Sequence, residues 1–286
     1  MIARRSPIAT ALYALALLAG LVVMGFPLFW MVRGALIGQA DWTRVPLVWL
    51  PTPETITPDA FVGIFTSPQF RMGRVLANTF LLATVTMVCR VLFDCMAGFA
   101  LAKMRVPGKR VILFGLVLTL MVPFEGLMVS LYLVVSKLGL YNTWPGVLLP
   151  AAASAFGIIL MSRFFRQVPD ELIEAAVVDG AGWGKIFFGV AMPLAAPSVA
   201  TVAVLSFLAG WDQFIWPLLI TDPGSDFDVL QKVLANATMI SAAGSTDTEW
   251  PWLMAGSLVA TVPVLVLFIA CQRFFVAGLT SGGVKG

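Results

Sequence analysis

Residues 6–32 form the longest stretch of the chain without a charged side chain, and Arg4 and Arg5 precede it. A helix needs about 20 consecutive apolar residues to cross the hydrocarbon core of a bilayer. The apolar part of a cleaved secretory signal is shorter, typically about 7 to 15 residues. We therefore expect residues 8–32 to form a retained membrane-spanning helix.

Five further apolar stretches of spanning length follow the first one. Their expected limits are about 76–102, 111–136, 141–162, 187–211 and 252–272. Charged residues make up 12% of the chain, about half of their share in a soluble domain, so lipid is the expected solvent. The sequence predicts an all-α integral membrane protein, in which residues 1–286 form one domain with six transmembrane helices.

The basic residues are distributed unevenly between the two ends of these helices. With the N-terminus in the cytoplasm, eleven Lys and Arg residues lie on the inner side and six on the outer side. Four of the inner ones fall within residues 103–110. Because inner loops of membrane proteins carry an excess of Lys and Arg, we expect both termini to be cytoplasmic.

A polar segment, residues 168–190, separates the fourth expected span from the fifth. Pro169 suits the first turn of a helix, where its missing N–H is not needed. Asp170, Glu171 and Glu174 then place acids near the positive N-terminal end of that helix. We expect a short cytoplasmic helix that begins at Pro169 and ends at Val178.

Two glycines, Gly180 and Gly182, follow this helix and can adopt the left-handed backbone angles that end helices. A second helix is expected to begin at Trp183. The first helix also carries apolar residues at helical spacing, which a groove on another protein can cover. These residues are Leu172, Ile173, Ala176 and Val177. The segment therefore predicts a cytoplasmic helix-turn-helix that binds a partner.

The order of residues in this segment resembles the signature loop of the permease subunits of binding-protein-dependent ABC importers. The matching residues are Glu174, Ala175, Ala176, Asp179, Gly180, Ala181 and Pro193. Matches elsewhere, from Asn78 to the closing Gly283-Val284-Lys285-Gly286, resemble the maltose-type carbohydrate-uptake permeases. The resemblance implies the type I ABC importer permease fold, with this coupling loop docking a cytoplasmic ATPase.

The resemblance also implies partners, location and cargo. A homologous second permease subunit would complete a heterodimer, two cytoplasmic ATPase subunits would bind ATP and Mg²⁺, and an extracytoplasmic solute-binding protein would deliver the solute. This chain would bind no cofactor and would lie in the bacterial cell membrane, in contact with lipid. The implied solute is a di- or oligosaccharide, or a sugar-like solute such as glycerol 3-phosphate, translocated by alternating access.

Several function classes are disfavoured by what the chain lacks. It contains no histidine, the commonest metal ligand and general base. Its three cysteines, Cys89, Cys95 and Cys271, do not have the spacing of a metal site or a disulfide framework. The Lys and Arg residues form no basic face with interleaved aromatics, which nucleic-acid binding would need. We expect no catalytic residue, no metal site and no nucleic-acid partner.

Charged side chains inside the expected spans mark candidate sites, because each costs about 2.5–3.5 kcal/mol to insert. Arg90 and Asp94 are four residues apart, hence on one face of a helix, and can form an ion pair. Glu125 follows Pro123 in the middle of the third expected span, where proline interrupts a helix. Glu125 can line a solute path or satisfy the interrupted backbone.

Trp211, Asp212 and Gln213 lie at the expected outer end of the fifth span. Aromatic residues at such a boundary often anchor a helix at the membrane interface, but an indole face beside a carboxylate and an amide also suits a sugar. These three residues and Glu125 are the candidates for the solute path. The alternative function is a self-contained, ion-coupled secondary transporter that uses a buried carboxylate such as Glu125.

Overall fold

The computed structural model describes residues 7–42, 44–68, 70–242 and 249–281. Helices dominate these residues, which contain no β-strand and only an isolated bridge between Ile37 and Ile56. Contacts group the chain into two compact units. The units are Met1–Met72 with Leu234–Pro263, and Gly73–Val233 with Val264–Gly286.

The first unit contains α1, whose most apolar 18-residue window has no buried residue. The side chains of this window are therefore available to lipid or to another protein. At the end of α1, the Arg33 guanidinium lies 4.5 Å from the centre of the Trp30 ring, and its Nε donates a 2.7 Å hydrogen bond to the Val48 carbonyl. The elements of this unit are α1 (Pro7–Ala35), α2 (Gln39–Trp42), α3 (Asp59–Thr66), and parts of α14 (Leu230–Ala242) and α15 (Trp250–Ser281).

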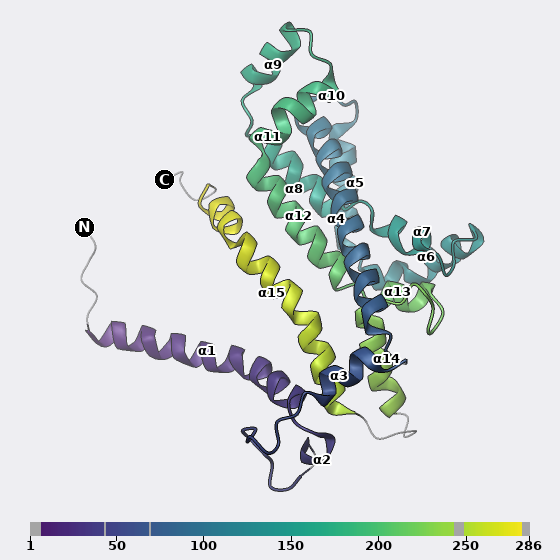
Figure 1. The fold of residues 1–286 in the computed structure, drawn as a ribbon. Helices are drawn as coiled ribbons and strands as arrows, with labels where there is room; N and C mark the ends of the chain where they lie inside the picture. Colours follow the sequence, from purple (N-terminus) through teal and green to yellow (C-terminus); the bar gives the residue numbers. More distant parts are fainter. Residues whose placement is uncertain (1–6, 43, 69, 243–248, 282–286) are drawn as a thin grey trace. The chain divides into compact units, whose positions relative to one another are not determined.

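The second unit contains all the candidate site residues named above. Its elements are α4 (Met72–Lys103), α5 (Lys109–Met121), α6 (Phe124–Lys137), α7 (Trp144–Leu148), the 3₁₀-helix η1 (Leu149–Ala151), α8 (Ala155–Phe165), α9 (Asp170–Val178), α10 (Trp183–Ile186), the π-helix η2 (Phe187–Ala191), α11 (Met192–Leu194), α12 (Ala196–Trp211) and α13 (Ile215–Ile220). In Figure 1, α9 lies at one end of the group formed by α4, α8 and α12.

Among the described residues, three single helices have the length and composition to cross a membrane, and three bent pairs raise the possible number of spans to six. The single helices are within α1, α4 and α15. The bent pairs are Lys109–Met121 with Phe124–Lys137 (102°), Trp144–Ala151 with Ala155–Phe165 (44°), and Trp183–Leu194 with Ala196–Trp211 (87°). The stretches expected at 111–136, 141–162 and 187–211 are therefore each built from two helices.

Proline lies at or next to each of the three breaks. Pro123 directly precedes α6 with an extended backbone, Pro150 lies in η1, and Pro197 occupies the first turn of α12. Proline lacks the N–H that would continue a helical ladder, and it favours an extended residue before it. Pro123 thus accounts for the first break. Leu149, the residue before Pro150, keeps helical angles, so proline alone does not explain the break after η1.

Glycines allow α4, α8 and α12 to approach one another closely. A Cβ atom on Gly98 of α4 would lie 2.8 Å from Met161 Cβ of α8. A Cβ atom on Gly210 of α12 would lie 2.7 Å from Ala83 Cα of α4. Small residues at such crossings let helix backbones pack tightly in a membrane, where burial of apolar surface gives no driving force. These crossings make α4 the central helix of the group.

Candidate functional site

The coupling loop contains the predicted helix, turn and helix. Helix α9 ends in a Schellman motif, in which Gly180 N–H donates to the Val177 carbonyl (3.0 Å) and Ala181 N–H donates to the Ala176 carbonyl (2.9 Å). Gly180 has φ +77°, in the left-handed region. Gly182 has φ −69° and ψ 157°, so the left-handed angles allowed for it are not adopted. One glycine makes the turn, and the other extends the chain into α10.

One face of α9 is packed against its own chain. Ile173 is buried with Phe99 of α4, Phe165 of α8 and Phe187 of η2, and Ala176 packs against the same cluster. Two of the four residues expected to face a partner, Ile173 and Ala176, therefore contribute to the internal core instead. This core holds α9 at the end of α4 and α8.

The rest of the α9 surface remains exposed and carries apolar side chains on either side of the buried pair and opposite it. Leu172 is 44% exposed, Val177 49% and Val178 85%. The signature residues Glu174, Ala175, Asp179 and Gly180 are exposed beside them, Ala176 and Ala181 are half-buried, and Pro193 is exposed on α11. An exposed apolar surface, on a helix whose Ile173 and Ala176 pack against the core of its own chain, is suited to binding another protein.

Lys103, the last residue of α4, connects that helix to the beginning of α9. Its side chain is only 5% exposed, and its ammonium group donates to the Val168 carbonyl and pairs with the Asp170 carboxylate. Asp170 is the first residue of α9. From the sequence, Lys103 was only one of the charges that orient the protein in the membrane. Its partners lie more than 60 residues away, and no local signal identifies them.

A cavity of about 520 Å³ lies where the loop after α12 faces α4, α6 and η1. Its volume is within the range of about 300–1,000 Å³ that is usual for ligand pockets. It is lined by Arg90, Phe124, Pro150, Ala151, Ala209, Asp212, Gln213, Phe214, Ile215 and Trp216. Aromatic rings and a few polar groups thus converge on one space, as in sites that bind polar organic molecules.

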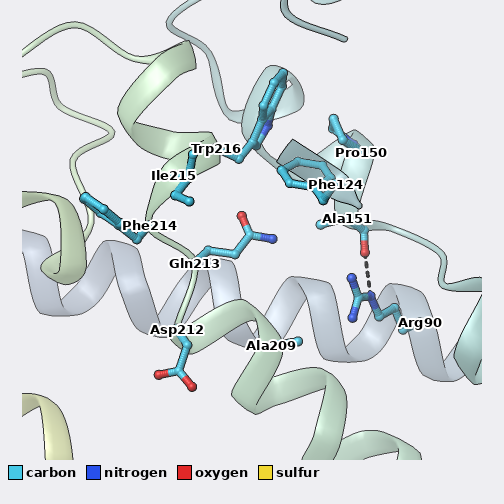
Figure 2. A pocket seen from close by; sticks show the side chains of 10 residues that line it. All are labelled: Arg90, Phe124, Pro150, Ala151, Ala209, Asp212, Gln213, Phe214, Ile215 and Trp216. Atoms are coloured by element: carbon cyan, nitrogen blue, oxygen red, sulfur yellow. Dashed lines mark hydrogen bonds between the residues drawn. The ribbon is translucent and has the colours of Figure 1, made fainter. Parts of the chain in front are cut away.

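Gln213 is the polar group best placed toward the cavity, and Trp216 lines the cavity although it is only 3% exposed. Figure 2 shows the Gln213 amide directed toward the middle of the cavity, between Trp216 and Arg90, whereas the Asp212 carboxylate is turned away from it. Among the described residues, Gln213 Oε1 has no hydrogen-bond partner. The Trp216 indole is held by its Nε1–H, which donates to the Gly146 carbonyl (3.1 Å). The Gln213 oxygen is therefore buried without a hydrogen-bond partner in the described part of the chain, beside a fixed aromatic ring.

Two of the four residues predicted for the solute path lie outside this cavity. Trp211 is 2% exposed and stacks on Phe207, with ring centres 5.9 Å apart, so it belongs to the interior of its unit. Glu125 is exposed in the first turn of α6 and does not line the cavity. Its neighbour Phe124 lines the cavity instead, since one residue along a helix turns the side chain by about 100°.

Arg90 and Asp94 do not form the predicted ion pair. Within the described part of the chain, no nitrogen of Arg90 lies within 4 Å of an Asp94 carboxylate oxygen. Arg90 Nε donates to the Ala151 carbonyl (2.8 Å), and Asp94 Oδ1 accepts from Ser154 N–H (2.9 Å). Both residues also line a second cavity, of about 230 Å³. Each charge is directed at the break between η1 and α8 rather than at the other.

The loop between α13 and α14 is organised around a buried lysine. Lys232 is 1% exposed, and its ammonium group donates to Thr221 O (3.1 Å), Thr221 Oγ1 (2.7 Å) and Asp222 O (2.8 Å) and pairs with Asp228 (2.6 Å). Tyr141 donates a hydrogen bond to Asp222 from outside the loop (2.8 Å), and this bond raises the pKa of Tyr141. The loop is thereby fixed at both of its ends.

Among the described residues, no group of three or more Cys, Asp or Glu side chains can hold a metal ion. Cys95 is buried, and Cys89 and Cys271 are half-buried, all three as free thiols.

Comparison with known proteins identifies the family. Residues 95–281 match the family described as "Binding-protein-dependent transport system inner membrane component". The chain is 32% identical over 283 residues to the arabinooligosaccharides transport system permease protein of Halalkalibacterium halodurans, covering 99% of both chains. It is 33% identical to the trehalose transport system permease protein of Mycobacterium tuberculosis (90% of this chain, 97% of the relative). It is 32% identical to the sn-glycerol-3-phosphate transport system permease protein of Yersinia pestis (92% and 93%).

Solved structures agree with this assignment at the level of the fold. A chain of a crystallised bacterial ABC transporter involved in the import of the acidic polysaccharide alginate superimposes with a TM-score of 0.82 at 23% identity, covering 96% of this chain and 99% of that chain. The predicted type I ABC importer permease fold is thus confirmed, and the protein is a multi-pass membrane protein. The chain belongs to the family of inner membrane components of binding-protein-dependent transport systems.

Proposed function

We propose that this chain is one permease half of an ATP-driven importer for a carbohydrate or a closely related polyhydroxylated solute. The observation that carries the proposal is the chemistry common to the named relatives, whose solutes are arabino-oligosaccharides, trehalose and glycerol 3-phosphate. All three are rich in hydroxyl groups. A di- or oligosaccharide leads, because two of the three are sugars.

The 520 Å³ cavity supports this choice through its polar and aromatic groups. Gln213 Oε1, which has no partner within the described structure, would accept a hydrogen bond from a solute hydroxyl. The Trp216 ring borders the cavity, but because it is only 3% exposed it would offer little area for stacking on a sugar. Asp212 is a weaker candidate, because its carboxylate is turned away from the cavity.

Coupling to ATP is assigned to the exposed face of α9. Leu172, Val177 and Glu174 would bind a groove on a cytoplasmic ATPase subunit, and that subunit would hold ATP and Mg²⁺. Because Lys103 and the aromatic core attach α9 to α4 and α8, a movement of the ATPase would reach the helices that line the cavity. Rocking of those helices would expose the cavity alternately to the two sides of the membrane. This chain would then perform no catalysis of its own.

The remaining parts of the proposal concern assembly and orientation. A homologous permease subunit would complete the path, two ATPase subunits would bind from the cytoplasm, and a solute-binding protein would deliver the solute from the other side. The excess of basic residues on the side of α9 favours cytoplasmic termini in a bacterial cell membrane.

The test is purification of this subunit in mild detergent, identification of the chains that co-purify, and ATPase and uptake assays in liposomes with the binding protein. Recovery of an ATPase and a second permease, with hydrolysis stimulated by one sugar, is the expected result. A subunit that transports solute alone, driven by an ion gradient, would refute the proposal in favour of a secondary transporter.

A further inference from the structure

The break between η1 and α8 leaves backbone groups without partners in their own helices. The first helical segment ends at Ala151, the second begins at Ala155 with Ser154 as its N-cap, and the two are bent by 44°. The last carbonyls and the first N–H groups of any helix lack internal partners. Inside a membrane, lipid cannot satisfy them, so other parts of the protein or water in a cavity must do so.

One turn of α4 supplies a partner on each side of the break. Arg90 Nε donates to the Ala151 carbonyl, and Asp94 Oδ1 accepts from Ser154 N–H, across about 60 residues of sequence. The positive side chain thus meets the carbonyl end of one segment, and the negative side chain meets the N–H end of the next. This arrangement matches the partial charges of the two helix ends. Four residues of α4 rise by about 6 Å, which is enough to reach both sides of the break.

Gly157 in the first turn of α8 allows the carboxylate to come this close. Asp94 is fully buried, and a Cβ atom on residue 157 would lie 2.0 Å from Asp94 Oδ2. Ser154 also caps its own helix by accepting a hydrogen bond from Gly157 N–H (3.3 Å). The N-terminus of α8 is therefore fixed by one side chain from within the helix and one from α4.

The same contacts position a wall of the 520 Å³ cavity. Pro150 and Ala151, at the end of η1, line this cavity together with Arg90. Figure 2 shows the bond from Arg90 to Ala151 on the side of the cavity opposite Phe214 and Ile215, with the Gln213 amide between them. We infer that Arg90 and Asp94 are positioning residues: they brace the break between η1 and α8, and thereby hold the cavity wall that faces Gln213. The inference rests on the proposed function, because the wall affects transport only if solute uses the cavity.

We call the two hydrogen bonds, from Arg90 to the Ala151 carbonyl and from Ser154 N–H to Asp94, the brace. Exchange of the two charges should affect the brace but not a simple ion pair. In R90D/D94R an ion pair would survive, whereas the brace would place a carboxylate beside the Ala151 carbonyl and a guanidinium beside Ser154 N–H. We expect ATP-driven uptake by the reconstituted complex to fall at least about tenfold, the size of effect that loss of a buried hydrogen bond produces. Uptake near that of the unmodified protein would overturn the inference.

A second comparison uses two substitutions at one position, of which one is expected to keep activity. D94N keeps an oxygen that accepts from Ser154 N–H, and D94L has a similar size but no acceptor. The brace predicts uptake close to the unmodified level for D94N and a loss for D94L. A residue needed for its charge would lose uptake in both variants, and that result would contradict the brace.

Melting temperatures of the detergent-solubilised subunit provide a reading that needs no transport. The brace predicts that D94N melts near the unmodified protein, and that D94L and R90D/D94R melt lower. Equal melting of D94N and D94L would overturn the inference. Failure of the proposed function has a different signature, namely no uptake by the unmodified complex while the order of melting temperatures persists.

Discussion

Replacing Gly180 by alanine tests the coupling turn with a single methyl group. Gly180 has φ +77°, and an ideal Cβ atom there meets nothing within 4 Å. Steric contact therefore adds no penalty, and the whole cost comes from the left-handed backbone, roughly 1–2 kcal/mol for an L-residue. A cost of that size lowers the ratio of the turn to its alternative conformations about 5- to 30-fold. We expect uptake by the complex to fall, by that factor at most.

The matched control is Gly182, two residues along the same exposed segment. It also has open space around it, but its φ of −69° is available to any residue. G182A should therefore transport normally, and G180N should be milder than G180A because asparagine tolerates left-handed angles. The assay compares uptake and solute-stimulated ATP hydrolysis at equal amounts of inserted subunit. Equal uptake by G180A and G182A would refute the reasoning.

Three further substitutions test other parts of the structure. K103M removes the charged hydrogen bonds that hold the start of α9, and such a bond contributes about 1.5–3 kcal/mol. ATP hydrolysis should therefore persist with less solute carried per ATP. The control is R110M, at an exposed residue, and an unchanged ratio of solute to ATP in K103M would contradict the role of Lys103 in coupling. Q213L removes the Gln213 Oε1 acceptor. The loss of one hydrogen bond of about 1 kcal/mol should weaken uptake about fivefold. Uptake by Q213L equal to that of the unmodified protein at limiting solute would exclude Gln213 from the solute path. K232M leaves the buried Asp228 carboxylate without its cation, a change that costs about 3–5 kcal/mol in buried pairs. The solubilised K232M subunit should therefore melt at a clearly lower temperature than K137M, the control at an exposed lysine. Equal melting temperatures would show that the pair of Lys232 and Asp228 is dispensable.

The coupling loop was predictable because its signals are local. The proline before α9, the acids in its first turn and the glycine after it all act on neighbouring backbone groups. Sequence could not decide between Gly180 and Gly182 for the left-handed turn, since both fit the pattern. That choice depends on which residue lets Ala181 N–H reach the Ala176 carbonyl.

The sequence marks Arg90 and Asp94 as charges within an apolar stretch, but it does not give their contacts. The spacing of Arg90 and Asp94 shows that they share a face of α4, and an ion pair is the simplest local solution. Their actual partners, Ala151 and Ser154, lie about 60 residues further on. The bend that exposes those backbone groups is a property of another helix pair, which periodicity in α4 does not reveal.

The burial of Trp211 follows from helix geometry, which hydropathy does not describe. An aromatic residue at the end of an apolar stretch is a reasonable interface anchor. Trp211 is four residues after Phe207, so both lie on the same face of α12, and the rings stack with an interplanar angle of 16°. That face is buried, since Phe207 is 8% exposed and Trp211 2%. The cavity is lined instead by residues 212–216, which follow the end of α12.

The loop between α13 and α14 supplies oxygen atoms in the way a small cation site does, but the cation that they surround is the ammonium group of Lys232, a residue of the same chain. Two backbone carbonyls, a hydroxyl and a carboxylate surround the Lys232 ammonium. Such oxygen ligands are the ones that Ca²⁺ takes in proteins. Because the lysine is covalently attached, the loop keeps its shape without drawing on dissolved ions. Its form should be the same in a calcium-poor medium, or in the presence of a chelator, as in a calcium-rich one.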